Sequence, residues 1–229
     1  MPSTVVHCAL AGLLAAALLG PAFDRRAVAV VLLVTVVPDL DVFSGVVLPG
    51  THRALLHTLL VPALVGGLVV YDTRLRERSW LLGRHGWWGV RVAWVAVLAY
   101  AFAGIGLDLF VGGANPLYPL HDQFYRFSGS IEYSTQRGWV QTFVEVAPPE
   151  TASGGGAGGR GAPTVDAGQL GSTAEVHVSS GVDPSRGAEP ADVDRVFPVV
   201  RSGWQLLLVL TSLVALAGRA VESRRPDRL

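Results

Sequence analysis

The chain has 229 residues, of which 50% are hydrophobic and only 16% are charged, well below the roughly 25% of soluble domains, so too little polar sequence exists to coat a soluble fold. The net charge of zero argues against a nucleic-acid-binding surface, and the single cysteine, Cys8, excludes a disulfide framework and a thiolate zinc site. These values indicate a multi-pass helical protein of the cell membrane, with the lipid bilayer as its first partner.

Two apolar segments open the chain. The first, at residues 4–21, is preceded by no basic residue, so we expect a retained helix rather than a signal peptide, with His7 near the membrane edge. The second, at residues 27–37, is rich in β-branched residues and short for a full crossing. Proline lacks an N–H group and restricts the preceding residue, so Pro38 should end this helix. Asp39 and Asp41 should then lie on less regular backbone.

A third apolar segment is expected as a helix over residues 53–71, with Thr51 as its N-cap. His52 would lie at the mouth of this helix. His57 would lie about 7 Å deeper, at about 1.5 Å of rise per residue. Because five residues turn a regular helix by roughly 140°, the two histidines need not bind as an adjacent pair.

The later chain alternates between polar and apolar segments. Residues 72–91 carry five arginines and predict a cytoplasmic loop, and a fourth span over residues 90–110 places Asp108 in its last turn, facing the protein interior. A small hairpin is expected around residues 136–138. The predicted organisation is all-α with about five transmembrane helices: a membrane-embedded domain (1–120), an external hairpin segment (121–146), a disordered Gly-, Ala- and Ser-rich loop (147–202), a last helix (203–221) and a basic cytoplasmic tail (222–229).

The arginines predict the orientation of the chain in the membrane. Five crossings with an external amino end place every short arginine-rich loop in the cytoplasm, in agreement with the positive-inside tendency. The same topology gathers the candidate site at the outer edge. Its members are His7, Asp39, Asp41, His52, His57 and Asp108, with His121 just beyond.

Aspartate and histidine together are ligands that suit Zn²⁺ or a similar divalent ion. Charged residues beside apolar spans are costly and therefore suggest a function. The alternative is an ordinary polar loop between two helices. Because these residues gather at one membrane face instead of scattering over both, the metal-site interpretation is favoured.

The order of these residues resembles that of the LexA-regulated, membrane-bound metal-dependent hydrolases. The resemblance is carried over residues 1–120 by His7, the Pro-Asp-Leu-Asp sequence at 38–41, His52-Arg53 with His57-Thr58, and Leu107-Asp108 before an Asn-Pro-Leu-Tyr-Pro segment. It implies a helical inner-membrane protein that binds divalent metal. That family is remotely similar to zinc-dependent phospholipases C and nucleases, which implies phosphoester substrates.

The chain departs from that family at two places. Gly104 stands where the family commonly has a histidine four residues before the last aspartate, and Ala54-Leu55-Leu56 lacks the Gly and Thr of the family's His-Arg-Gly-x-Thr-His. The missing ligand at Gly104 has three explanations: a one-metal site, replacement by His121, or a decayed enzyme. For His121, the alternative is that it simply begins the external hairpin, exposed to water.

The sequence thus predicts a hydrolase in which metal-activated water attacks an ester at the outer face, with a phosphoester or a lipid as the candidate substrate. Metal ligands are expected among His7, Asp39, Asp41, His52, His57, Asp108 and His121, with zinc as the first choice. Asp41 is the expected proton acceptor, His52 a ligand or proton donor, and Arg53 either a phosphoryl-binding group or a snorkelling charge. The rival prediction is a non-catalytic membrane protein with a structural metal or an ion-conducting polar cluster.

Overall fold

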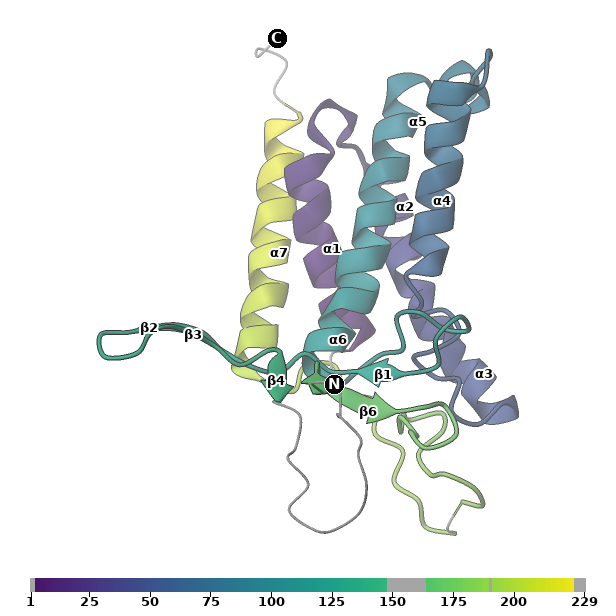
Figure 1. The fold of residues 1–229 in the computed structure, drawn as a ribbon. Helices are drawn as coiled ribbons and strands as arrows, with labels where there is room; N and C mark the ends of the chain where they lie inside the picture. The colour runs from purple at the N-terminus through teal and green to yellow at the C-terminus, as the bar shows by residue number, and fades with distance from the viewer. Residues whose placement is uncertain (1–2, 148–163, 190, 225–229) are drawn as a thin grey trace, which may run out of the picture.

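Helices running alternately up and down form the body of the protein in the computed structural model (Figure 1). The structure describes residues 3–147, 164–189 and 191–224. The chain begins at the lower end of the bundle in Figure 1, and the last helix ends at the upper end. The long helices are α1 (Thr4–Leu18), α2 (Arg25–Val36), α4 (Leu60–Val70), α5 (Trp80–Leu98) and α7 (Gly203–Glu222).

Side-chain caps fix where several helices begin. Ser3 accepts a hydrogen bond from the first turn of α1, and Asp24 accepts one of 2.7 Å from Ala27 N at the start of α2. Ser79 caps α5 in the same way, accepting from Leu82 N at 3.0 Å. Each cap satisfies one of the backbone N–H groups that a helix start leaves without an intrahelical partner.

The bundle core between α1, α2 and the α5 region is built largely of alanine. Ala11, Ala15, Ala27, Ala99 and Ala103 are all fully buried there. Small side chains let helix backbones approach closely, which is how helices associate in a lipid environment. Helix α7 also packs on α1. The helices are so close at Gly12 that a side-chain carbon added there would collide with Ser212.

Pro38 ends regular helix, as predicted from the sequence. Helix α2 ends at Val36, and a 3₁₀ turn, η2 (Pro38–Asp41), leads into the short helix α3 (Val42–Val47). The turn carries Asp39 and Asp41 at the lower end of the bundle.

The predicted start of the third helix is wrong. Helix α4 begins at Leu60, and the residues from Thr51 to Leu59 form turns instead of the expected helix. Arg53 has a φ of +63°, in the left-handed region, which a helix starting at this residue would not contain. Contacts with a distant segment hold these turns, because Leu59 N donates to Pro116 O (2.8 Å) and Asn115 N donates to Arg53 O (2.8 Å). His52 and His57 therefore do not share a helix.

The expected cytoplasmic loop over residues 72–91 is shorter than predicted. A π-helical turn, η3 (Tyr71–Leu75), follows α4, and α5 already begins at Trp80. Asp72 organises the turn by accepting hydrogen bonds from the Ser79 hydroxyl (2.6 Å) and from the backbone N–H groups of Trp80 (3.0 Å) and Leu81 (2.9 Å). This turn lies at the upper end of the bundle, opposite the aspartates of η2 (Figure 1).

A π-helical segment joins α5 to the short helix α6. It spans η4 (Ala99–Gly106), and α6 (Leu107–Val111) carries Asp108. Hydrogen bonds in a π-helix reach one residue further than in an α-helix, which changes the register of everything that follows. Gly104 lies in this segment, and a carbon added to it would come within 2.9 Å of Pro38 Cγ. No space therefore exists here for the histidine that the resembling family carries.

Among the described residues, three helical runs are long and apolar enough to cross a membrane: Arg25–Val47, Trp80–Val111 and Gly203–Glu222. Thr4–Leu18 is apolar but shorter, and α4 has 11 residues. The structure thus supports a mostly helical membrane protein, while the predicted number of five crossings is not confirmed.

Short antiparallel strand pairs lie beside the lower end of the bundle. The hairpin predicted around residues 136–138 forms between β2 (Ile131–Ser134) and β3 (Gly138–Gln141). The other pairs are β1 (Phe124–Tyr125) with β6 (Gln169–Gly171), and β4 (Glu145–Ala147) with β5 (Thr164–Asp166).

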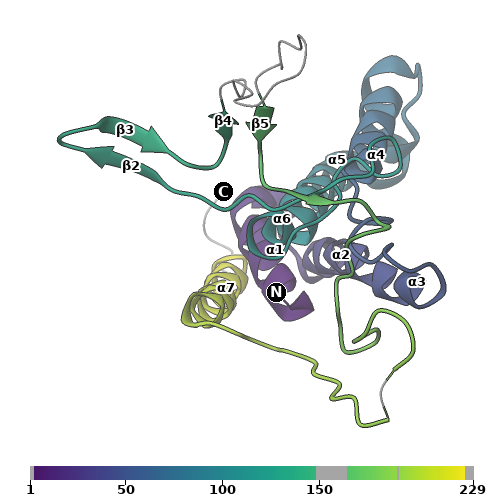
Figure 2. The ribbon, with the colours of Figure 1, turned by 60° about the horizontal axis from the view of Figure 1, so that its bottom comes forward.

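The prediction of a disordered loop over residues 147–202 is wrong for the part of it that the structure describes. Strand β6 pairs with β1, and Val178 packs against Ala54 and Phe124 in a small buried cluster. The chain then passes α2 and α3 before it reaches α7 (Figure 2). Residues 148–163, which include the Gly-rich stretch, lie outside the described residues.

Candidate metal centre

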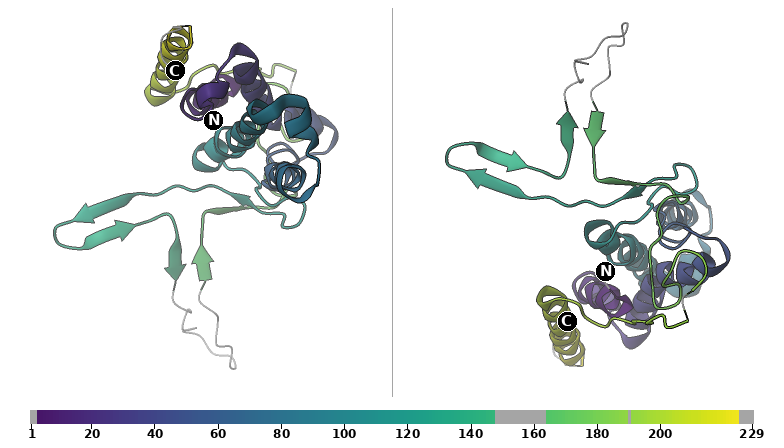
Figure 3. Two further views of the ribbon diagram at one scale, coloured as in Figure 1. Left: turned by 90° about the horizontal axis from the view of Figure 1, so that it is seen from above. Right: turned by 90° about the horizontal axis from the view of Figure 1, so that it is seen from below.

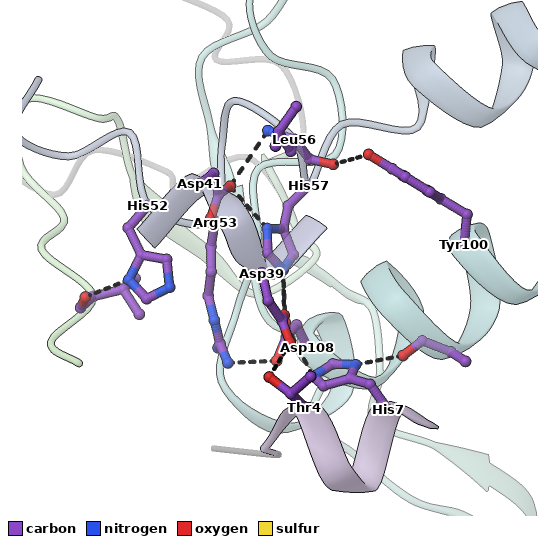
Figure 4. Close-up of polar contacts among 12 residues, drawn as sticks. Thr4, His7, Asp39, Asp41, His52, Arg53, Leu56, His57, Tyr100 and Asp108 are labelled. Carbon is purple, nitrogen blue, oxygen red and sulfur yellow. Dashed lines mark hydrogen bonds and ion pairs between the residues drawn. The ribbon is translucent and has the colours of Figure 1, made fainter. Parts of the chain in front are cut away.

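Four separate segments bring polar side chains together at the lower end of the bundle (Figure 4). His7 comes from the second turn of α1, and Asp39 and Asp41 come from η2. Arg53 and His57 come from the turns before α4, and Asp108 comes from α6. Most of these side chains are fully buried, so their charges must be balanced within the protein.

Three of these residues form a candidate metal-binding group among the described residues. His7, Asp39 and Asp108 each offer one ligand atom, and these atoms all lie within 4.8 Å of one another. The Nε2 atom of His7 lies 3.7 Å from Asp108 Oδ2. Thr4, one turn before His7, donates a hydrogen bond of 2.5 Å from its hydroxyl to Asp39 Oδ2 and so orients that carboxylate.

His57 lies between two carboxylates. Its Nδ1 atom is 2.9 Å from Asp41 Oδ2, and its Nε2 atom is 2.9 Å from Asp108 Oδ2 and 3.9 Å from Asp39 Oδ1. Asp41 therefore lies at one edge of the imidazole ring, and the candidate group lies at the other (Figure 4). The carboxylate of Asp41 also accepts from Leu56 N at 3.3 Å, which fixes it to the turn that carries His57.

Both histidines are oriented as metal-bound histidines commonly are. His7 Nδ1 lies 2.5 Å from the carbonyl oxygen of Ala103, which can only accept, so Nδ1 carries a hydrogen and Nε2 is left as the lone-pair nitrogen. His57 Nδ1 faces a carboxylate in the same way. Ligating histidines usually donate their other N–H to a carboxylate or a backbone carbonyl, which fixes the ring. The Nε2 atoms of both rings then face Asp108.

The charges of the cluster call for a cation. Three carboxylates and the Arg53 guanidinium leave two unbalanced negative charges when both imidazoles are neutral. If His57 is neutral with its hydrogen on Nδ1, its Nε2 lone pair lies 2.9 Å from an oxygen of Asp108 that also only accepts. These two acceptors need a positive group between them. A proton is one such group: burial alone would lower the pKa of His57, but hydrogen bonds to Asp108 and Asp41 raise it to about 9.

Arg53 is committed to the cluster and does not snorkel to the surface. Its side chain is buried, with Nη2 2.5 Å from Asp108 Oδ1 and Nη1 3.3 Å from the carbonyl of Gly113. Arg53 has left-handed backbone, and its guanidinium reaches Asp108 in α6. The guanidinium thus holds Asp108 on the side that faces away from His57.

A cavity of about 560 Å³ gives access to the cluster from one side. Asp39 is 22% exposed, whereas the side chains of His7, His57 and Asp108 are about 1% exposed, so Asp39 is the ligand candidate that meets the cavity. Val42, His52 and Arg53 form part of the wall. The opposite wall comes from the later chain, including Ser179, Ser180, Val182, Phe197 and Arg201.

His52 is positioned by that later chain. Its Nδ1 atom is 2.8 Å from the carbonyl oxygen of Val178, so Nδ1 donates and Nε2 carries the lone pair. Burial lowers the pKa of His52, which favours the neutral ring. His52 lines the cavity beside Asp39 but does not belong to the three-residue group.

Of the residues predicted from the sequence, the structure brings together His7, Asp39, Asp41, Arg53, His57 and Asp108. His121 lies apart: it is exposed, and its Nε2 atom is 2.9 Å from the Tyr125 hydroxyl. Sequence reasoning missed Thr4 and the carbonyl of Ala103. Thr4 could have been identified from the sequence, because it lies three residues before His7 and residues three apart on a helix share a face.

Comparisons with known proteins identify one family. A model described as the YdjM inner membrane protein matches residues 3–163, more than half of the chain. The match includes all the residues of the cluster and ends before the later chain that walls the cavity. Searches of curated proteins and of solved structures found no significant match.

Proposed function

The chain belongs to the YdjM inner membrane protein family and is a multi-pass membrane protein, and from this premise we propose that it is a membrane-bound, metal-dependent hydrolase. Family membership supports the membrane part of the resemblance noted from the sequence. Hydrolase activity and regulation by LexA stay predictions.

The observation that carries the proposal is the arrangement of the two imidazoles. Each ring uses Nδ1 in a hydrogen bond to a fixed acceptor and turns Nε2 towards Asp108. The Nε2 atoms lie 2.9, 3.7 and 3.9 Å from the nearby carboxylate oxygens. Neighbouring ligands of a tetrahedral Zn²⁺ site with bonds of about 2.0–2.1 Å are about 3.3 Å apart, so small adjustments fit the ion. His7, Asp39, His57 and Asp108 would hold it.

A bound divalent cation would supply Lewis acidity, which polarises an ester oxygen and makes water acidic near neutral pH. The protein's own groups divide the remaining tasks. Asp41 holds the His57 ring and lies behind it, so we assign it a positioning role in place of the proton acceptor expected from the sequence. His52 lines the cavity, its Nε2 carries the lone pair, and we assign it that proton-accepting role.

The position and lining of the cavity support a proposal for the substrate class. The cavity lies at one end of the bundle, and its lining includes Arg201 together with apolar residues such as Val42 and Phe197. Arg53 also borders the cavity, but its guanidinium is bound to Asp108. Guanidinium groups suit phosphate and carboxylate oxygens, so we propose an anionic ester, either a phosphoester or a lipid. The arginine-rich turn at the other end of the bundle supports an external site.

One observation favours a second candidate function, a closed structural metal site in a protein without hydrolase activity. The side chains of His7, His57 and Asp108 are about 1% exposed, and structural metal sites are closed whereas catalytic sites keep an open position. The exposed fraction of Asp39 is what distinguishes the two, because a substrate needs a route to the ion.

The test uses the full chain purified in detergent. Metal content after chelation and reloading is compared among wild type, Asp39→Ala and His121→Ala, and turnover of a generic phosphodiester and a carboxylic ester is measured with each. The proposal expects one bound ion and turnover in wild type and His121→Ala, and loss of both in Asp39→Ala. Bound metal without turnover on any ester supports the structural site. Absence of specific metal binding by wild type overturns both.

A further inference from the structure

The β2–β3 hairpin leaves the bundle as a separate arm. Viewed along the helices it extends sideways, well beyond the outline of the bundle (Figure 3), and seen from the side it runs roughly at right angles to the helix axes (Figure 1). Its ladder pairs Ile131 with Gln141 and Tyr133 with Trp139. Its direction therefore places it parallel to the plane that a membrane around the bundle would occupy.

The two faces of the hairpin differ in chemistry. Alternate residues of a strand point to opposite faces, so Ile131, Tyr133 and Trp139 share one face, with their side chains 67%, 66% and 78% exposed. Tyr133 and Trp139 are in edge-to-face contact, with ring centroids 5.5 Å apart. Glu132 lies on the other face and forms an ion pair of 3.2 Å with Arg137 in the turn. One face, the aromatic face, thus carries Ile131, Tyr133 and Trp139 with Gln141 at its end, and the other carries Glu132 opposite Val140.

Nothing among the described residues covers the aromatic face. The sheet has two strands, and a two-stranded hairpin is marginally stable in water without a further strand or packing partner. Exposed tryptophan and tyrosine beside apolar spans are typical of the membrane–water interface, where the ring is buried and its polar atom stays hydrated.

Aromatic contacts connect a candidate membrane span to the base of the hairpin. Phe110, near the end of the Trp80–Val111 span, is 59% exposed and contacts Phe127 and Phe143, with ring centroids 5.9 and 6.4 Å apart. Phe143 follows the base of the hairpin, where Thr142 N donates to Ser130 O at 3.0 Å. Aromatic side chains therefore run from the span to the base of the hairpin, and the polar Ser130–Thr142 pair separates them from Tyr133 and Trp139.

We propose that the hairpin is an interfacial anchor, which lies along the bilayer with Ile131, Tyr133 and Trp139 in the headgroup region and Glu132 and Arg137 in water. Its partner is the lipid surface of the leaflet at the end of the bundle that holds the metal centre. This role does not depend on metal binding or on hydrolysis. It also accounts for the exposure of three apolar side chains on a short, isolated hairpin.

The test measures which face of the hairpin meets lipid. Single cysteines replace Tyr133 or Glu132 in a Cys8→Ala background, carry an environment-sensitive fluorophore, and are reconstituted in phosphatidylcholine–phosphatidylglycerol vesicles. Quenching by a nitroxide on the lipid acyl chain should be several-fold stronger for Tyr133→Cys than for Glu132→Cys, and quenching by aqueous iodide should show the reverse. Trp139→Cys and Val140→Cys repeat the comparison on the partner strand, so one misfolded variant cannot decide the result.

Two results would overturn the inference. Equal access of iodide to both faces on both strands would show that the hairpin stands in water. Protection of the aromatic face from both quenchers would show that protein covers it, either another part of this chain or a second copy.

Discussion

Replacing Asp41 by asparagine tests whether this residue acts through His57. In the structure, Asp41 Oδ2 accepts from His57 Nδ1 at 2.9 Å and from Leu56 N at 3.3 Å. The Oδ1 atom is buried and has no hydrogen-bond partner among the described residues. An asparagine of the same shape keeps one acceptor oxygen in the Oδ2 position but removes the negative charge. The His57 ring therefore keeps its place, and its bond to residue 41 weakens.

The expected loss follows from the kind of hydrogen bond. A bond to a charged group contributes about 1.5–3 kcal/mol and a neutral one about 0.5–1.5 kcal/mol, so the change removes about 1–2 kcal/mol of support for the ligating ring. That corresponds to a roughly 5–30-fold weaker binding of Zn²⁺. Removal of a ligand, as in Asp39→Ala, should cost considerably more.

Competition with a fluorescent zinc chelator, on protein in detergent, measures this difference. Asp24→Asn, which changes a helix cap at the other end of the bundle, is the matched control and should bind as wild type does. An unchanged affinity in Asp41→Asn would refute the positioning role. A complete loss, equal to that of Asp39→Ala, would make Asp41 a direct ligand, as the sequence alone had suggested.

Two further predictions concern stability. Gly104→Ala should lower the melting temperature by about 2–12 °C in detergent, because the new carbon meets Pro38 Cγ at 2.9 Å and overpacking costs about 1–3 kcal/mol. Gly106→Ala is the control and should not lower it, because the nearest contact of its new carbon is at 3.4 Å. Equal melting temperatures of the two variants would contradict the packing argument. The Ser79 hydroxyl and two backbone N–H groups hold the pKa of Asp72 at about 2, below its ordinary 3.8. Its stabilising effect should therefore be complete above about pH 4 and disappear as the pH falls towards 2, and thermal melts of Asp72→Asn should lack this part of the pH dependence.

The helices could be predicted where local sequence decides them. Apolar runs and Pro38 indicate α1, the end of α2 and α7 without knowledge of the fold. The start of α4 could not be predicted, because the turns before it are held by hydrogen bonds to Asn115 and Pro116, more than 50 residues away. Such non-local contacts override a plausible N-cap at Thr51.

The sequence predicts which residues gather at the candidate site, but not the role of each residue. Topology alone gathers His7, Asp39, His57 and Asp108 at one end of the bundle, where the structure has them. It does not show that Asp41 lies behind His57 or that the later chain positions His52, because both depend on side-chain direction. The Gly- and Ser-rich composition of the later chain predicts a disordered loop, because composition does not reveal single buried anchors such as Val178.

The site depends on the number of residues in the π-helical segment before Asp108 more than on which side chains that segment carries. Removing one residue between Ala99 and Gly106 would change how far the chain turns before α6, and therefore the direction in which Asp108 points. Asp108 would then leave His57 and Arg53, and an ionised carboxylate would turn towards the lipid or an alanine-lined helix contact, at a cost of roughly 2.5–3.5 kcal/mol or more. A deletion that keeps every functional side chain would thus disable this centre, whereas many apolar substitutions within the segment would leave it intact.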